Sequence, residues 1–296
     1  MKSARFRGFW LHYAAPALIA LYAIAGITLA LIRHASFHTD VLDLGYFTHI
    51  VWNTSQGRLF ANDIPPNPPI SLQDHFALAL IFLAPMMWGM PDARALLIAT
   101  ILCLVLAMIP VYLIVRDKHP LLAPFVVLAM VLNPLGHQLA TAEFHDIMLA
   151  LPVLSFALYA LYRKKQVWLT VAFGLALLVR EDMGVYVACF GLLMLIIRPG
   201  FRRLGLAALV IGLGWSLAIV QIVIPMFGAQ YRHVNVFINM GDSFGQIAQT
   251  MLSRLPTEFV GLFTAQRLGI YLRLFLPLAF LPLFVAGEQL LWLPAS

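Results

Sequence analysis

The sequence predicts an all-helical, multi-pass membrane protein, and composition is the first reason. Of the 296 residues, 62% are apolar and only 11% are charged, whereas soluble domains contain roughly 25% charged residues. The mean hydropathy is +0.89, and apolar runs recur along the whole chain. We therefore expect one transmembrane domain over residues 1–296 in the cytoplasmic (inner) membrane. We expect no nucleic-acid partner, in spite of a net charge of +6.

The first apolar run, residues 13–33, is expected to be a retained transmembrane helix. It follows Lys2, Arg5 and Arg7, as the apolar core of a signal peptide would. However, the run has ~20 residues, which is enough to span a bilayer, and a signal-peptide core has only ~7–15 residues. We expect the N-terminus to lie in the cytoplasm.

Whether the segment 76–91 crosses the membrane determines on which side each later loop lies. It is short for a span and contains Pro85. If it lies on the outer surface of the membrane, the N-terminus and residues 116–119, 162–166 and 198–203 all face the cytoplasm. These four segments hold eleven of the nineteen Lys and Arg residues, and basic loops are typically cytoplasmic. We therefore expect that 76–91 does not cross.

This orientation predicts eight transmembrane helices and two long outer loops. The first outer loop, residues 34–92, includes the membrane-parallel segment 76–91, and the second covers residues 228–267. The chain end is expected to begin a ninth helix. The eight helices are predicted at residues 13–33, 93–115, 121–138, 147–162, 166–179, 183–197, 204–227 and 268–287.

Acidic residues gather on the outer side in this arrangement. Eleven of the thirteen Asp and Glu residues fall in outer loops or at outer helix ends. Acidic residues contribute little to membrane orientation, so topology does not explain the asymmetry. A cluster of acids on one membrane face predicts a functional site there.

The first outer loop carries two candidate motifs. "VLDLGYFTHIVWNTSQGRLF" (41–60) places Asp43 ahead of an aromatic-rich helical segment, where it is either a functional acid or the N-cap of that helix. "QDHF" sets Asp74 beside His75. This pair would bind a cation or a phosphate, or be ordinary interfacial residues.

The motif "VREDMG" (179–184) joins two apolar runs with almost no loop. Charged side chains so close to hydrocarbon normally pair with one another or line an aqueous cavity. The preceding "EFHD" motif is expected at the same membrane depth, which favours the cavity. Its lining would come from both motifs, with Arg180 beside it: His145, Asp146, Glu181 and Asp182.

The second outer loop contributes Arg232 and His233 as candidate donors to an anion. The fork of an arginine guanidinium suits a phosphate, and an interfacial anchor is an equally good interpretation of Arg232. "GDSFGQIAQTMLSRLP" is typical of an amphipathic helix that lies along the membrane interface.

Taken in order, several of these motifs resemble a known family. They are "DVLDLGYFTHIVWNTSQGRLF", "QDHFALALIFLAP", "EFHD", "VREDMGVYVACFGL" and "YRH…GDSFGQI". They resemble a family of uncharacterised bacterial and archaeal membrane proteins that is placed in the GT-C glycosyltransferase superfamily. The resemblance covers the chain from about residue 13 to its end. Members usually continue with more helices and an outer domain, so it also implies a C-terminal truncation.

The resemblance implies a GT-C-like bundle with a catalytic acid in the first outer loop. That acid corresponds to Asp43 here, with Asp40 as a nearby substitute. The implied reaction moves a sugar, with inversion, from a polyprenyl-phosphate donor to an unidentified acceptor, with Asp43 as general base. A divalent cation such as Mg²⁺ or Mn²⁺ sometimes assists in this superfamily. Apart from the resemblance, we infer from the residues themselves that the donor phosphate, or such a metal, would meet Asp74, His75, Arg180, Arg232 and His233.

Two other functional classes fit parts of the pattern. One is a transporter or channel with an outward-facing polar cavity, and the other is a non-catalytic membrane scaffold. Transporters place ionisable residues near the middle of their helices. Here the centres of the predicted helices are nearly free of charge, which favours chemistry at the membrane interface.

Overall fold

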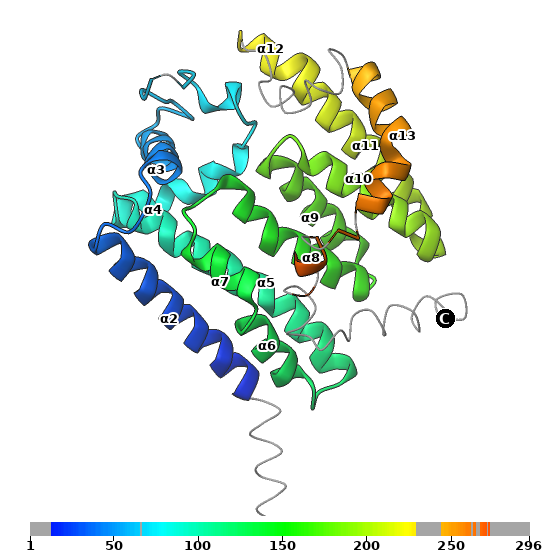
Figure 1. Cartoon of the computed structure of the whole chain (residues 1–296), viewed down its shortest axis with the longest axis horizontal. Coiled ribbons are helices and arrows are strands. Elements are labelled where there is room, and N and C mark those ends of the chain that lie inside the picture. The colour runs from blue at the N-terminus through cyan, green and yellow to red at the C-terminus, as the bar shows by residue number, and fades with distance from the viewer. Residues whose placement is uncertain are drawn as a thin grey trace, which may run out of the picture.

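The computed structural model describes residues 13–65, 67–228, 244–261, 263–264, 267–270 and 272. These residues form helices joined by loops, and one antiparallel bridge, between Ala61 and Ile70, is the β-type pairing among them. The helices form a bundle, and the first loop folds across one of its ends (Figure 1). The all-helical prediction is confirmed.

The first layer of the bundle consists of α2 (Ala15–Ala35), α5 (Arg94–Lys118) and α6 (Ala123–Val131). The first two match the helices predicted at 13–33 and 93–115. Both end in basic residues, where the apolar run stops. Their shared core is built from apolar side chains of all three helices, among them Ile19, Tyr22, Ile101, Leu104 and Val127.

The single helix predicted at 121–138 is wrong, because the structure divides it into α6 and α7 (Pro134–Thr141). The two helices meet at an angle of 51°. Pro134 lacks the N–H that would continue α6. Asn133 starts the new helix, since its side-chain oxygen accepts hydrogen bonds from the N–H groups of Leu135 (2.9 Å) and Gly136 (3.3 Å).

The second layer contains the remaining bundle helices, in antiparallel succession. Two of them match the predicted ranges 166–179 and 183–197. The helix predicted at 204–227 is also continuous, and a π-helical turn lies within it. The helices are η4 (Asp146–Leu149) with α8 (Ala150–Tyr162), α9 (Gln166–Val179), α10 (Met183–Ile197), η5 (Pro199–Phe201), α11 (Arg202–Ala218), η6 (Ile219–Val223) and α12 (Ile224–Met226).

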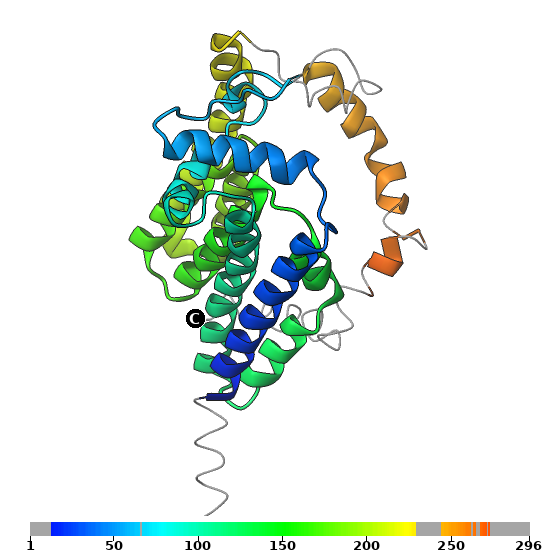
Figure 2. The same cartoon turned by 90° about the vertical axis from the view of Figure 1, so that its left-hand side faces the viewer.

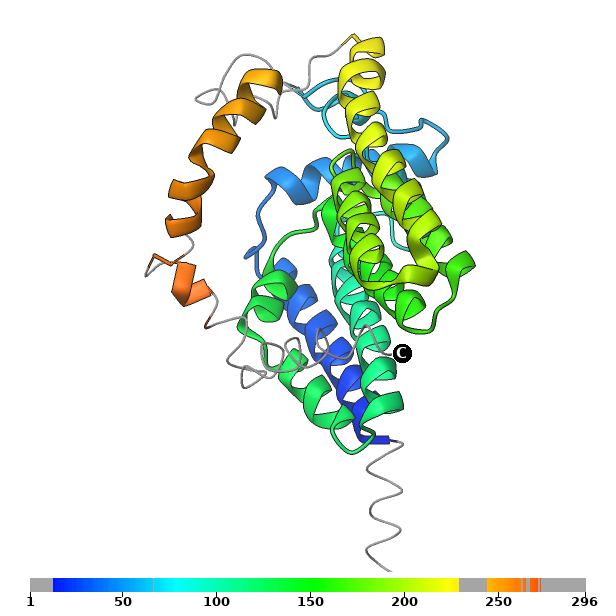
Figure 3. The same ribbon diagram turned by 90° about the vertical axis from the view of Figure 1, so that its right-hand side faces the viewer.

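Glycine brings α10 and α11 into unusually close contact (Figure 3). A Cβ atom on Gly184 would lie 2.2 Å from the carbonyl oxygen of Gly212, and one on Gly191 would lie 2.5 Å from the nitrogen of Leu209. Small residues allow such approach of membrane helices. The contact also places Ser216, whose hydroxyl donates to the carbonyl of Glu181 at 2.6 Å.

Helix α3 (Leu42–Ser55) lies across the end of the bundle rather than along it (Figure 2). Beneath it pack η3 (Leu78–Leu83) and α4 (Ala84–Gly89). These two short helices span roughly 20 Å at 1.5–2.0 Å per residue, whereas the hydrocarbon layer is ~30 Å thick. The segment 76–91 therefore forms two short helices that pack beneath α3, and not one continuous helix of spanning length.

Three described helices are long and apolar enough to span a membrane: Ala15–Ala35, Arg94–Lys118 and Pro199–Met226. The bent pair α6 and α7 would make a fourth. The eight predicted spans are not supported by length alone, because several bundle helices are shorter than a span, including Asp146–Tyr162, Gln166–Val179 and Met183–Ile197.

The second outer loop contains α13 (Phe244–Gly261), where an amphipathic helix was predicted. In Figures 2 and 3 this helix stands beside the bundle. Most of the predicted helix 268–287, and the ninth helix, lie outside the described residues.

Candidate functional site

The two ends of the bundle carry opposite kinds of charge. At one end, Arg163 donates to Asp117 at 2.7 Å and Gln166 donates to the carbonyl of Gly200 at 3.3 Å. These bonds join the three basic segments 116–119, 162–166 and 198–203. Three acidic segments meet at the other end, through the contacts described below. They are the first outer loop, the "EFHD" motif and the "VREDMG" motif. This segregation agrees with the predicted orientation.

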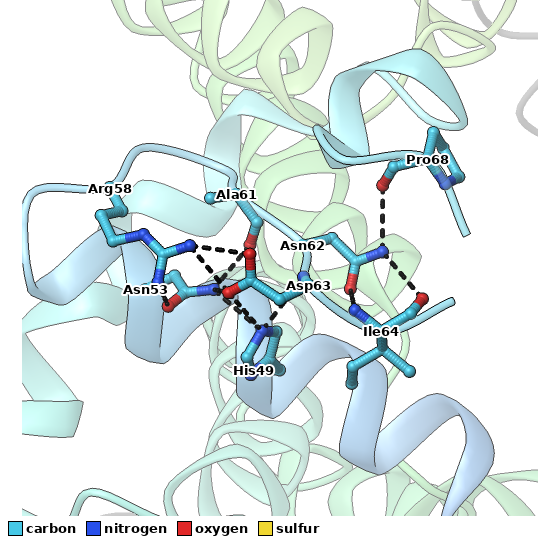
Figure 4. A network of polar contacts seen from close by, with 8 residues as sticks. All are labelled: His49, Asn53, Arg58, Ala61, Asn62, Asp63, Ile64 and Pro68. Atoms are coloured by element: carbon cyan, nitrogen blue, oxygen red, sulfur yellow. Dashed lines mark hydrogen bonds and ion pairs between the residues drawn. The ribbon is translucent and has the colours of Figure 1, made fainter. Parts of the chain in front are cut away.

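The loop after α3 folds back onto that helix and holds it in place (Figure 4). Asn53 is fully buried and donates to the carbonyl of Ala61 at 2.9 Å. Arg58 binds both carboxylate oxygens of Asp63, at 2.8 and 2.7 Å, which lowers the pKa of Asp63. Asn62 donates to the carbonyl of Pro68 at 3.0 Å, so the proline-rich segment is part of the ordered platform.

At the start of α3, two aspartates have different functions. Asp40 Oδ1 accepts hydrogen bonds from the N–H groups of Val41 (2.6 Å) and Leu42 (3.2 Å), so Asp40 satisfies the first helical donors. Asp43 lies in the first turn and makes no cap. The alternative that Asp43 is the N-cap is therefore wrong. Its carboxylate is 57% exposed and lies 3.7 Å from Nε2 of His145.

A four-residue segment, Glu143–Asp146, connects the exposed edge with the protein interior, and we call it the strap. His145 has an extended backbone (φ −125°, ψ 145°), and in an extended chain successive side chains point to opposite sides. Glu143 and His145 face the start of α3. Glu143 Oε1 accepts the N–H of Asp40 at 2.8 Å, and His145 faces Asp43.

The other two strap residues point inward. Phe144 is fully buried, and its ring meets that of Phe47 in α3 edge to face, with centroids 5.6 Å apart. Asp146 is 2% exposed. Its Oδ1 accepts the N–H of Ile147 at 2.8 Å, and its Oδ2 has no hydrogen-bond partner within the described part of the chain.

A buried ion pair lies deeper in the same end of the bundle. Glu181, 1% exposed, accepts hydrogen bonds from Nδ1 of His75 at 2.8 Å and from the N–H of Phe76 at 2.9 Å. Burial opposes ionisation of both groups. The contact nevertheless dominates: it lowers the pKa of Glu181 to about 2 and raises the pKa of His75. The pair therefore favours the charged forms.

Arg180 is engaged by two carboxylates. Its Nε donates to Asp182 Oδ1 at 3.0 Å and its Nη2 donates to Asp182 Oδ2. Nη1 lies 3.9 Å from Asp146 Oδ1. Of the two interpretations of the "VREDMG" turn, the structure contains the ion pair. Asp146 and Glu181, which were expected to line a cavity, lie in the protein interior.

The remaining candidates lie at the border of this cluster or beyond the described residues. Asp74 is half-buried, next to His75 and directly after η2 (Ser71–Gln73). Gln73 donates to the carbonyl of Phe227, so the second outer loop begins beside the first. Arg232 and His233 lie outside the described residues. Sequence reasoning missed the contact of Glu143 with Asp40 and the structural role of Phe144, although both residues belong to the "EFHD" motif.

The expected divalent cation finds no matching donor set in the described residues. None of their His, Cys, Asp and Glu side chains converge in a group of three or more that could hold a metal ion. Asp40 is occupied by backbone N–H groups, and Asp43 faces a single His145.

A family model described as "Predicted membrane protein (DUF2079)" matches residues 33–295. The chain belongs to this family. The match includes both outer loops, the strap and the buried ion pair. No curated protein and no solved structure matches the chain.

Proposed function

We propose that this member of the DUF2079 family is a GT-C-type glycosyltransferase that uses a lipid-linked sugar, with Asp43 as its general base. The observation that carries the proposal is the state of Asp43. Its carboxylate is exposed, is free of capping because Asp40 serves that need, and faces His145. It also sits on a helix that lies across the acidic end of the bundle.

The reaction can be written with these atoms. An acceptor hydroxyl attacks the anomeric carbon of a sugar carried on a polyprenyl phosphate. The new C–O bond forms as the bond from that carbon to the phosphate oxygen breaks. The hydroxyl proton goes to the carboxylate of Asp43, and the polyprenyl phosphate leaves with the electron pair. Attack opposite the leaving phosphate inverts the anomeric carbon.

The cationic residues divide into two groups in this proposal. Arg180 binds Asp182 and approaches the buried Asp146, and His75 binds the buried Glu181. We therefore assign Arg180 and His75 the positioning of the strap rather than direct contact with the donor. Contact with the donor phosphate then falls to His145, which is 45% exposed, and to Arg232 and His233 of the second outer loop. A cation at the departing phosphate stabilises the charge that develops there.

We also propose that the shorter helices α8, α9 and α10 cross the membrane. Helices α8, α9 and α10 each connect the basic end of the bundle to the acidic end, as α5 does. A helix of 14 residues, such as α9, measures ~21 Å. Short spans are accommodated by local thinning of the bilayer. We therefore infer that these helices cross together with the longer ones.

The transport alternative is disfavoured by the position of the charges. Helices α8, α9 and α10 contain no Asp, Glu, Lys or Arg, and α5 carries charges only at its two ends. A transporter needs ionisable groups near the middle of the membrane. In the described bundle helices α5, α8, α9 and α10 they lie at the helix ends or in the adjoining loops instead.

The test compares two aspartates that lie three residues apart. Native mass spectrometry of the purified chain measures binding of a polyprenyl phosphate against ordinary phospholipids, and a transfer assay uses polyprenyl-phosphate sugars. Asp43→Asn should keep lipid binding and lose transfer. Asp40→Asn should keep both, since Asn caps a helix as well as Asp. Absence of any preference for the polyprenyl phosphate would reject the donor, and full transfer by Asp43→Asn would reject the base.

A further inference from the structure

We propose a second lipid-binding site in this protein, for one anionic phospholipid of the cytoplasmic leaflet, in the groove between α8 and α9. It is independent of the transferase proposal, because it lies at the basic end of the bundle. The groove has a volume of about 560 Å³, within the range of roughly 300–1,000 Å³ that is typical of small-molecule pockets.

The walls of the groove suit an acyl chain. Phe156 of α8 and Val171 and Leu175 of α9 line it, and all three are exposed on the bundle surface. The groove extends along α9 from Lys165 to Leu175, ten residues or ~15 Å of helix. This length equals about half of the ~30 Å hydrocarbon layer, so it accommodates a tail that crosses one leaflet.

The basic end of the groove suits an anionic headgroup. Arg163 and Lys165 line it there, and both belong to a segment that the distribution of Lys and Arg places in the cytoplasm. Arg163 donates one hydrogen bond, from Nη1 to Asp117 at 2.7 Å. Because a guanidinium has five N–H donors, others remain for a phosphate.

An aromatic residue marks the level of the headgroup. Trp168 lines the groove one turn from Lys165 and is 67% exposed. Trp is enriched at the boundary between hydrocarbon and headgroups. A groove with apolar walls, a tryptophan at its mouth and two cations beyond it matches the order of groups in an anionic phospholipid. Basic pockets between helices on the cytoplasmic side bind such headgroups.

The test measures binding of phosphatidylglycerol and phosphatidylcholine with identical acyl chains to the full chain by native mass spectrometry. We expect phosphatidylglycerol to be preferred. The double variant Arg163→Gln/Lys165→Gln should weaken its binding about 25-fold, since each of the two basic side chains near an anionic headgroup contributes roughly fivefold. Val171→Trp should weaken binding by filling the groove without changing any charge.

A matched control removes two charges from the same end of the bundle. Arg202→Gln/Arg203→Gln alters residues that do not line this groove, and it should change phosphatidylglycerol binding less than twofold. Equal binding of the two lipids by the native chain would overturn the proposal. So would a loss of binding in the control that equals the loss in Arg163→Gln/Lys165→Gln, because the anion would then be bound by the basic end as a whole.

Discussion

Replacing Glu181 by alanine should destabilise the protein by about 3–5 kcal/mol, as loss of one partner of a buried ion pair does. The structure supports this magnitude independently. Glu181 accepts two hydrogen bonds, from His75 and from the N–H of Phe76, and a hydrogen bond to a charged group contributes about 1.5–3 kcal/mol. The substitution also removes the carboxylate that accepts from the N–H of Phe76 and from the imidazole of His75.

The measurement is the free energy of unfolding in mixed micelles, from a denaturant titration followed by tryptophan fluorescence. Asp63→Ala is the matched control, because both carboxylate oxygens of Asp63 accept from Nη2 of Arg58 while both side chains are 53% exposed. Exposed pairs contribute little to stability. Equal destabilisation by Glu181→Ala and Asp63→Ala would show that the buried pair stabilises the fold no more than an exposed one.

Three further outcomes are expected. The pKa of His75 is raised in the folded state, so its protonation stabilises the fold fully below pH ~6.5 and less as pH rises through the folded pKa. A series of unfolding titrations at different pH values should show the free energy of unfolding fall over this range, and His75→Gln should remove that fall. Gly212→Ala should destabilise by roughly 1–3 kcal/mol, because its Cβ would lie 2.3 Å from the Gly184 carbonyl. Gly214→Ala, with open space on the same helix, should be neutral or slightly stabilising in the same titration. Phe144→Ala should lower transfer activity at least tenfold and polyprenyl-phosphate binding by a smaller factor, because the strap that positions His145 loses its anchor; unchanged activity would contradict a positioning role.

The local sequence pattern was sufficient to predict helices that begin and end where an apolar run meets charged or turn residues. Apolar runs that end at charged or turn residues gave α9 and α10 their correct bounds. The break between α6 and α7 was missed because the average hydropathy of 121–138 outweighed Pro134 in the prediction. Helix length alone does not support the predicted eight spans in the described residues, since apolar runs do not reveal how many residues the helix itself retains.

The contacts of the candidate site depend on long-range packing, which a single sequence does not contain. Glu181 meets His75 across 106 positions, and Asp40 meets Glu143 across 103. The described acids of the first outer loop, the strap and the "VREDMG" turn lie at one end of the bundle as predicted, because their positions follow from topology. Which aspartate caps α3 could not be derived, because the choice depends on how the strap holds Asp40.

The buried charges beneath the strap are better explained by positioning than by stability. Each buried ion loses several kcal/mol of hydration, and apolar replacements of similar volume are often as stable. In this protein the ion pairs connect segments that are distant in the chain: His75 fixes the first outer loop to Glu181, and Arg180 approaches Asp146 of the strap. The strap in turn sets His145 against Asp43. A joint apolar replacement of His75 and Glu181 should therefore keep much of the stability and lose the transfer activity. Apolar side chains of similar volume would preserve the packing, but the hydrogen bonds that orient His145 against Asp43 through the strap would be lost.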